Sequence, residues 1–443
     1  MRIVRAGMAA LVAGAMVLVA APAAAQEGPL GSAGDLRAQL TALDVQHVNL
    51  TTLAVQNAVQ FGADSPQFTG ATRAVDANTN ALADAIGSVY GSSARQQFDD
   101  IWSEHVGFFV DYTKGAIAGD DAVKQRADAQ LRGTYRDKFS ALLSGATQGR
   151  LGADAVKQVL AGHIDSLEAA IDAIVAKRPD AATRIQEAAG YMTKPAAAVS
   201  AAIDDQFPDR FTGSAEGPAA DLLATLTSLD QQHVAQTVAV VKSAVAFGPD
   251  SPQFRAAAQA VDANTNALAD GIGSVYGSSA RQQFDDIWSE HVGFFVAYTN
   301  GALSGNDEMK READAQLRGT YRDKFSALLS GATDGRLAAD AVKQVLAGHI
   351  DSLEAAIDGV AAKSGDAPAK VSEAELYMQK PASAVAGAVV AQFPARFGTA
   401  GSGVLATTAS TEQVAAVAAG LLVVVGLLTV GLGRRAAAAS ARG

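Results

Sequence analysis

One long segment of the chain occurs twice in tandem. His47 recurs as His233, a shift of 186 positions because 233 − 47 = 186, and the same shift maps residues 34–212 onto 220–398 without a gap. A short segment rich in Gly, Ser and Pro joins the two copies. Since each copy of such a repeat is one structural unit, the chain is predicted to fold as two similar domains.

Within each unit, apolar residues recur at three- and four-residue spacing, and no stretch alternates in the manner of a strand. This pattern predicts an all-α fold of two tandem antiparallel helical bundles, with five to six helices each. Lys194-Pro195 is expected to kink or split the last helix of the first unit, because proline removes a backbone donor. Five of the helices expected in that unit cover residues 35–61, 66–87, 120–143, 153–177 and 181–207, and the third of the six, capped by Ser92-Ser93, has an inward stripe from Phe98 to Tyr112.

Both ends of the chain carry targeting signals. Arg2 and Arg5 precede an apolar run, and small residues before Gln26 suit cleavage, so residues 1–25 are predicted to be a signal peptide. Residues 414–432 are apolar and free of charge, which predicts a C-terminal transmembrane helix.

The segments beside that helix fix the expected orientation. Residues 399–413, rich in Gly, Ser, Thr and Ala, are interpreted as a flexible stalk. Residues 433–443 contain arginines and no acidic residue, so the positive-inside rule predicts a cytoplasmic tail. We therefore expect a single-pass protein of the cell membrane, with its N-terminal ectodomain outside and its C-terminus in the cytoplasm.

Charge and composition argue against several classes of function. The net charge of −11 argues against nucleic-acid binding, which requires a basic face. The chain has no cysteine, so an exported form would depend on core burial, metal or assembly rather than on disulfides. The fingerprints of phosphate loops, dinucleotide sites and nucleophile elbows are absent.

All six histidines of the chain lie in the repeat, three per unit, on the apolar stripes of three different helices. Side chains from facing helices of a bundle can converge, and three imidazoles can hold zinc, copper or iron while leaving one position open. The sequence therefore predicts one transition-metal site per unit. The candidate ligands are His47, His105 and His163 in the first unit and His233, His291 and His349 in the second.

Two further residues of each unit are candidate ligands. Asp44 lies one turn before His47, and the pair persists as Asp230 and His233 although residues around it have changed. Asp44 could share ligation or orient the imidazole. Met192 persists in the same way, as Met378, and a thioether added to imidazoles would favour copper.

Other interpretations are open at this stage. A histidine on an apolar stripe is often a hydrogen-bonded core residue, and an inward methionine often only fills a gap. That interpretation would leave a structural or partner-binding cell-surface protein. An open coordination position would instead suit a metal-dependent oxidase or hydrolase. The leading prediction is a non-catalytic metal-binding protein of the cell envelope, with no residue assigned to catalysis.

Several short motifs extend over nearly the whole first unit. They are His47-Val48 with Leu50-Thr51, Ile86-Gly87 with Tyr90-Gly91, Glu104-His105, Leu160 with His163, and Gln206-Phe207-Pro208 with Phe211. In these motifs the unit resembles a poorly characterised group of exported or surface-attached, all-helical bacterial proteins. The resemblance implies the fold and export, and implies no reaction because the group has no settled activity. Such proteins carry a further histidine near the end of the unit, where this chain has Tyr191-Met192, so a complete ligand set is not transferred.

Overall fold

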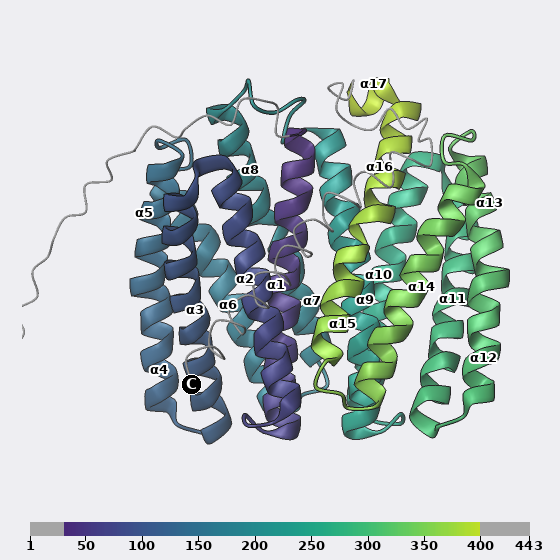
Figure 1. Cartoon of the computed structure of the whole chain (residues 1–443), viewed down its shortest axis with the longest axis horizontal. Coiled ribbons are helices and arrows are strands. Elements are labelled where there is room, and N and C mark those ends of the chain that lie inside the picture. Colours follow the sequence, from purple (N-terminus) through teal and green to yellow (C-terminus); the bar gives the residue numbers. More distant parts are fainter. Residues whose placement is uncertain (1–30, 399–443) are drawn as a thin grey trace, which may run out of the picture.

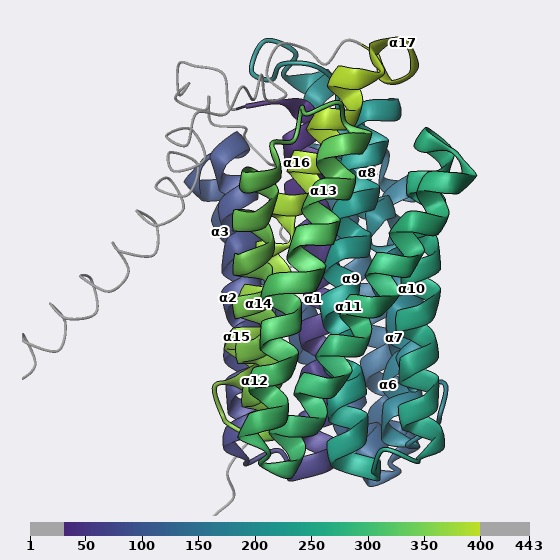
Figure 2. The ribbon, with the colours of Figure 1, turned by 90° about the vertical axis from the view of Figure 1, so that its right-hand side faces the viewer.

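The computed structural model describes residues 31–398. In this part the regular elements are helices, apart from an isolated bridge between Ser32 and Thr212, so the predicted all-α fold is confirmed. The long helices of both repeats run along one common direction (Figures 1 and 2). The predicted signal peptide, stalk, transmembrane helix and cytoplasmic tail lie outside the described residues. Between residues 31 and 398, no helix has both the length and the apolar character needed to cross a membrane.

The two repeats contain the same series of helices, except that the second ends with one additional short helix. In the first repeat these are α1 (Ala33–Phe61), α2 (Pro66–Tyr90), α3 (Ser92–Ala118), α4 (Asp121–Gln130), the π-helix η1 (Leu131–Tyr135), α5 (Arg136–Ala146), α6 (Ala153–Val175), α7 (Ala181–Tyr191) and α8 (Thr193–Gln206). In the second they are α9 (Pro218–Phe247), α10 (Pro252–Tyr276), α11 (Ser278–Ser304), α12 (Asp307–Gln316), the π-helix η2 (Leu317–Tyr321), α13 (Arg322–Ala332), α14 (Ala339–Ala361), α15 (Ala367–Tyr377), α16 (Gln379–Gln392) and α17 (Pro394–Phe397).

The helix boundaries follow the sequence signals closely. The Ser65 side chain caps α2 by accepting a hydrogen bond from the Phe68 backbone N–H, with Pro66 at the first helical position. The predicted break near Pro195 is present, because α7 ends at Tyr191 and α8 begins at Thr193. Proline then falls in the first turn of α8, where its missing N–H leaves no helical bond unmade.

The fourth predicted helix differs from the expectation. It is a continuous rod that extends past residue 143 to Ala146, and its middle five residues, Leu131–Tyr135, form the π-helix η1. The wider turn inserts one extra residue and rotates the side chains that follow it. The same insertion occurs in the second repeat as η2. Apolar spacing did not reveal it, since apolar residues four apart also fit a regular α-helix.

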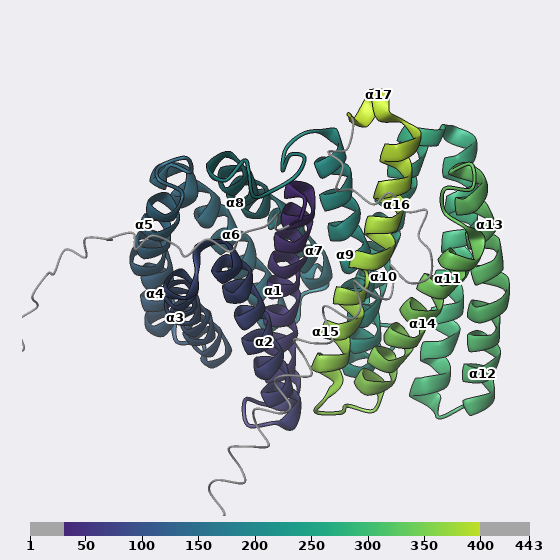
Figure 3. The same cartoon turned by 45° about the horizontal axis from the view of Figure 1, so that its top comes forward.

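The two repeats pack together through their first helices, α1 and α9, which lie side by side at the centre of the molecule (Figures 1 and 3). The contacts are reciprocal. The side-chain amide of Gln67 donates to the backbone oxygen of Lys363 at 2.6 Å, and its repeat equivalent Gln253 donates to the backbone oxygen of Lys177 at 2.8 Å. Such reciprocity is characteristic of a twofold, self-complementary interface. Leu50 of α1 even belongs to the apolar core of the second repeat, so the halves share buried surface.

Close backbone approach at this interface depends on Gly70 of α2. A Cβ atom added to Gly70 would lie 1.9 Å from the backbone oxygen of Gly365, in the loop between α14 and α15. No side chain fits there unless the two repeats move apart.

We therefore expect Gly70→Ala to lower the free energy of unfolding by about 1–3 kcal/mol, the usual cost of overpacking. Gly107→Ala is the matched control, because Gly107 lies on an exposed part of α3 where a Cβ meets nothing within 4 Å. That control is expected to be neutral or stabilising by up to ~1 kcal/mol, through its higher helix propensity. Urea denaturation measures both, and equal stability of the two variants would contradict the close contact between the repeats.

Candidate metal centre

The three histidines of the first repeat come from three helices that face one another. His47 lies on α1, His105 on α3 and His163 on α6. Each occupies the inward stripe of its helix, among residues such as Leu43, Trp102 and Leu160 that are buried in the same core. All three histidines are at most 2% exposed.

The structure brings these histidines together. One ring nitrogen from each lies within 4.8 Å of the others, in His47, His105 and His163 and equally in the second triad. In the second repeat, Nε2 of His233 and Nε2 of His291 are 3.4 Å apart. Two nitrogens bound to one tetrahedral zinc at its usual bond length are separated by about 3.3 Å. One pair of the second triad therefore already has this spacing, and the other pairs of both triads lie within 4.8 Å, close enough for small side-chain shifts to bring them onto one ion. The second consists of His233, His291 and His349.

Hydrogen bonding sets the tautomer of one ligand in each triad. Nδ1 of His105 lies 2.5 Å from the backbone oxygen of Trp102, and Nδ1 of His291 lies 2.6 Å from that of Trp288. A carbonyl oxygen only accepts, so Nδ1 carries the proton and donates it. The lone pair of Nε2 is then free to bind a metal, and the carbonyl holds the ring in place.

The other ring nitrogens lack partners. In the first triad both nitrogens of His47, both of His163 and Nε2 of His105 are buried with no hydrogen-bond partner. A buried polar atom without a partner costs about 1–3 kcal/mol, so five in one small volume require a physical reason. The simple core interpretation, in which each ring bonds a nearby carbonyl, applies to His105 alone. A metal ion is a partner that several of these lone pairs can share.

The triads are held in the protonation state that metal binding requires. Burial lowers the pKa of His47 to about 3 and that of His163 to about 4, and it also lowers the pKa of His105 well below the ordinary value. The neighbouring rings add to the shifts for His47 and His105, because two cations would repel at this distance. Neutral imidazoles present lone pairs at pH 7 without first losing a proton.

An aromatic shell surrounds the imidazoles. The Trp102 ring meets the His47 ring edge-on, with centroids 5.0 Å apart, and Phe109 contacts His163 in the same manner at 5.8 Å. Two pockets occur in the described part of the chain, one beside Lys242 and one beside Phe397, and none of the six histidines lines either of them. This environment excludes water from the triad and fixes the ring orientations.

One residue of this shell, Tyr135, was not among those predicted from the sequence. Its ring stacks on His105 with centroids 4.4 Å apart and planes inclined by 16°, and Tyr321 stacks on His291 in the same way. Tyr135 is the last residue of η1, so the π-helix positions it. The four-residue spacing of Leu131, Tyr135 and Phe139 could have marked Tyr135 as inward. Its contact with the triad depends on the inserted turn and could not be read from that spacing.

The two additional candidate ligands lie near the triad but outside the group of converging nitrogens. Asp44 is buried on α1, which raises its pKa to about 8. Burial also raises the pKa of Tyr135, and a negative charge on Asp44 would add to that increase. Met192 lies at the junction of α7 and α8, buried in the same core. Asp230 and Met378 are buried equivalently in the second repeat. Their participation in ligation stays a prediction.

No protein-family model, curated protein or solved structure matches this chain. The resemblance drawn from short motifs therefore gains no support from these comparisons, and the geometry of the triads carries the functional argument.

The lowered histidine pKa values predict how stability responds to acid. At pH 5.5, one unit below the ordinary histidine pKa, a histidine that is neutral in the folded state becomes protonated on unfolding. Each such histidine lowers the free energy of unfolding by about 1.4 kcal/mol at that pH. The stability that each neutral histidine contributes is therefore present above pH 6.5 and is lost as the pH falls toward 4. Asp44 and Asp230, with raised pKa values, act in the opposite direction.

We expect chelator-treated wild-type protein to lose about 3 kcal/mol more stability between pH 7.5 and 5.5 than a variant carrying His163→Leu and His349→Leu. Both proteins keep the two aspartates, so the opposing contribution cancels in the difference. Urea denaturation at the two pH values measures it. Identical losses would mean that these imidazoles are protonated in the folded state.

Proposed function

We propose that the protein binds one transition-metal ion in each repeat, through His47, His105 and His163 in the first and through His233, His291 and His349 in the second. The observation that carries the proposal is the convergence of buried, neutral imidazoles whose nitrogens lack other partners. Three nitrogen donors suit zinc, copper or ferrous iron. We regard the protein as a non-catalytic metal-binding protein, since both triads are enclosed by aromatic side chains.

The cost of burying unpaired polar atoms favours a bound ion over packing alone. Apolar residues of similar volume would fill these positions without leaving polar atoms unpaired. Coordination bonds to an ion would give the unpaired ring nitrogens a partner, so burying the three imidazoles would no longer be unfavourable. Binding is then expected to stabilise the folded state, because the unfolded chain does not preserve the three-helix arrangement.

Metal analysis of the purified chain tests the proposal. Wild-type protein reconstituted with zinc or copper and then dialysed is expected to retain two ions per chain by mass spectrometry of the elements. His163→Ala alone should retain one, and His163→Ala with His349→Ala should retain none, because the loss of one of three ligands removes most of the affinity. The intact triad of the single variant serves as an internal control.

Circular dichroism separates loss of a ligand from loss of the fold, since a large-to-small core substitution also destabilises. The proposal fails if folded wild-type protein retains no ion, or if the double variant retains as much as wild type.

We also propose that the protein is exported and attached to the cell membrane by residues 414–432. The support is the sequence of the two ends: a cationic start with an apolar run and a charge-free apolar segment before Arg434 and Arg435.

Deletion of residues 414–432 is expected to move the protein from the membrane pellet to the soluble extracytoplasmic fraction, because that deletion removes the only proposed anchor. Immunoblotting after fractionation measures this. A deletion of equal length within the proposed ectodomain would unfold it, so the appropriate control is replacement of residues 414–432 by a polyleucine segment, which should restore attachment. An unchanged membrane fraction after the deletion would contradict the proposed anchor.

A further inference from the structure

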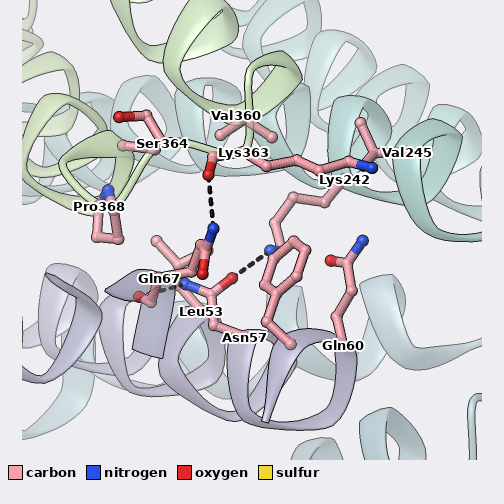
Figure 4. Close-up of a pocket in the computed structure, with 12 residues that line it drawn as sticks. Leu53, Asn57, Gln60, Gln67, Lys242, Val245, Val360, Lys363, Ser364 and Pro368 are labelled. Carbon is pink, nitrogen blue, oxygen red and sulfur yellow. Dashed lines mark hydrogen bonds between the residues drawn. The ribbon is translucent and has the colours of Figure 1, made fainter. Parts of the chain in front are cut away.

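A small cavity lies at the interface of the two repeats, away from both triads. Figure 4 shows that its walls come from α1 and α2 on one side and from α9, α14 and the start of α15 on the other. The space open to the centre of a water-sized sphere is about 20 Å³. That volume holds about one water molecule or one ion of similar size.

The Lys242 side chain reaches into this cavity from α9 (Figure 4). It is 7% exposed, and its Nζ donates one hydrogen bond, to Oδ1 of Asn57 at 2.6 Å. An ammonium group has three donors. Asn57 is itself held in place, since its Nδ2 donates to the backbone oxygen of Gln67 at 3.0 Å. The amide oxygen is thereby directed at the amine. The Phe61 ring lies with its centroid 5.7 Å from Nζ, and the remaining N–H donors have no hydrogen-bond acceptor among residues 31–398.

The charge of Lys242 has no carboxylate to balance it. None of the residues that line the cavity is acidic, and Lys363 adds a second positive charge at its rim. Among residues 31–398, no ion pair involves Lys242. Burial lowers its pKa to about 8, and at pH 7 the amine therefore still carries a proton. A buried cation without a counter-charge is costly, so this cavity attracts a negative ion.

The repeat shows that this arrangement is specific to one side of the interface. The equivalent of Lys242 is Gln56, and the equivalent of Asn57 is Ser243, since 242 − 186 = 56 and 243 − 186 = 57. The related position on the other side of the pseudo-twofold axis therefore has no lysine.

We infer that the cavity between the repeats binds one small monovalent inorganic anion of the halide class, held by the Lys242 ammonium group beside the Asn57 amide oxygen. The cavity is too small for phosphate or a carboxylate ligand with a side chain. The bound anion would neutralise Lys242 and join α1 of the first repeat to α9 and α14 of the second, so it would stabilise their association.

Chloride titration of chelator-treated full-length protein tests the inference at constant ionic strength, with gluconate as the replacing anion because it is too large to enter. Chloride is expected to raise the melting temperature of wild-type protein with saturation, by about 2 °C at ten times the dissociation constant. Lys242→Gln, which introduces the residue of the other repeat, is expected to lose this dependence. Lys363→Gln is the matched control, because it removes the same charge from the exposed rim and should keep most of the response.

Crystals grown in bromide provide a measurement that does not depend on a variant's folding. An anomalous peak within hydrogen-bonding distance of Lys242 Nζ is expected. The inference is overturned if that peak is absent, or if wild-type protein and Lys242→Gln respond to chloride equally. Chelator-treated protein is used for both measurements, so neither result depends on the occupancy of the histidine triads.

Discussion

The contact between α1 and α9 is the interaction on which the rest of the architecture depends. These two helices form the centre of the interface, and each also supplies one histidine to the triad of its own repeat, His47 from α1 and His233 from α9. A helix with buried residues on nearly all sides cannot shift without disturbing both neighbours. This explains why α1 is so fully buried and why its apolar stripe is poorly defined: 22 residues of α1 are buried, polar ones among them.

That double role places polar groups at the centre of the molecule, and they do not all find partners. Glu375 of α15 is 1% exposed at this interface, and burial raises its pKa well above the ordinary range. Nearby, the Gln46 side chain donates to the backbone oxygen of Ser372 at 3.0 Å and connects α1 to α15. Directional contacts of this kind fix the relative position of helices more narrowly than apolar packing does.

Much of the fold was predictable from the sequence because it follows from local rules. The 186-residue shift, the three- and four-residue spacing and the Ser65-Pro66 signal identified the repeat, the helices and their ends. The six histidines were identifiable because they are rare and lie on apolar stripes. Their convergence was only a hypothesis, because it depends on the orientation of three helices about their own axes. Tyr135 and the inter-repeat cavity were missed for a related reason: one requires a π-turn, and the other requires knowing which faces of two bundles meet.

The two repeats are alike around their histidine triads but differ at the interface between them. The triads and their aromatic shells are the same in both halves, with His47 against Trp102 and His233 against Trp288 at identical centroid distances of 5.0 Å. At the interface the copies differ: Lys242 corresponds to Gln56, Glu375 to Ala189 and Gly70 to Ala256. In a dimer of two identical units, every substitution near the twofold axis appears on both sides, so a buried charge would be introduced twice. Covalent linkage of the repeats removes that constraint. A single lysine can then enter the interface on one side, while the other side keeps an uncharged amide and the two histidine triads remain alike.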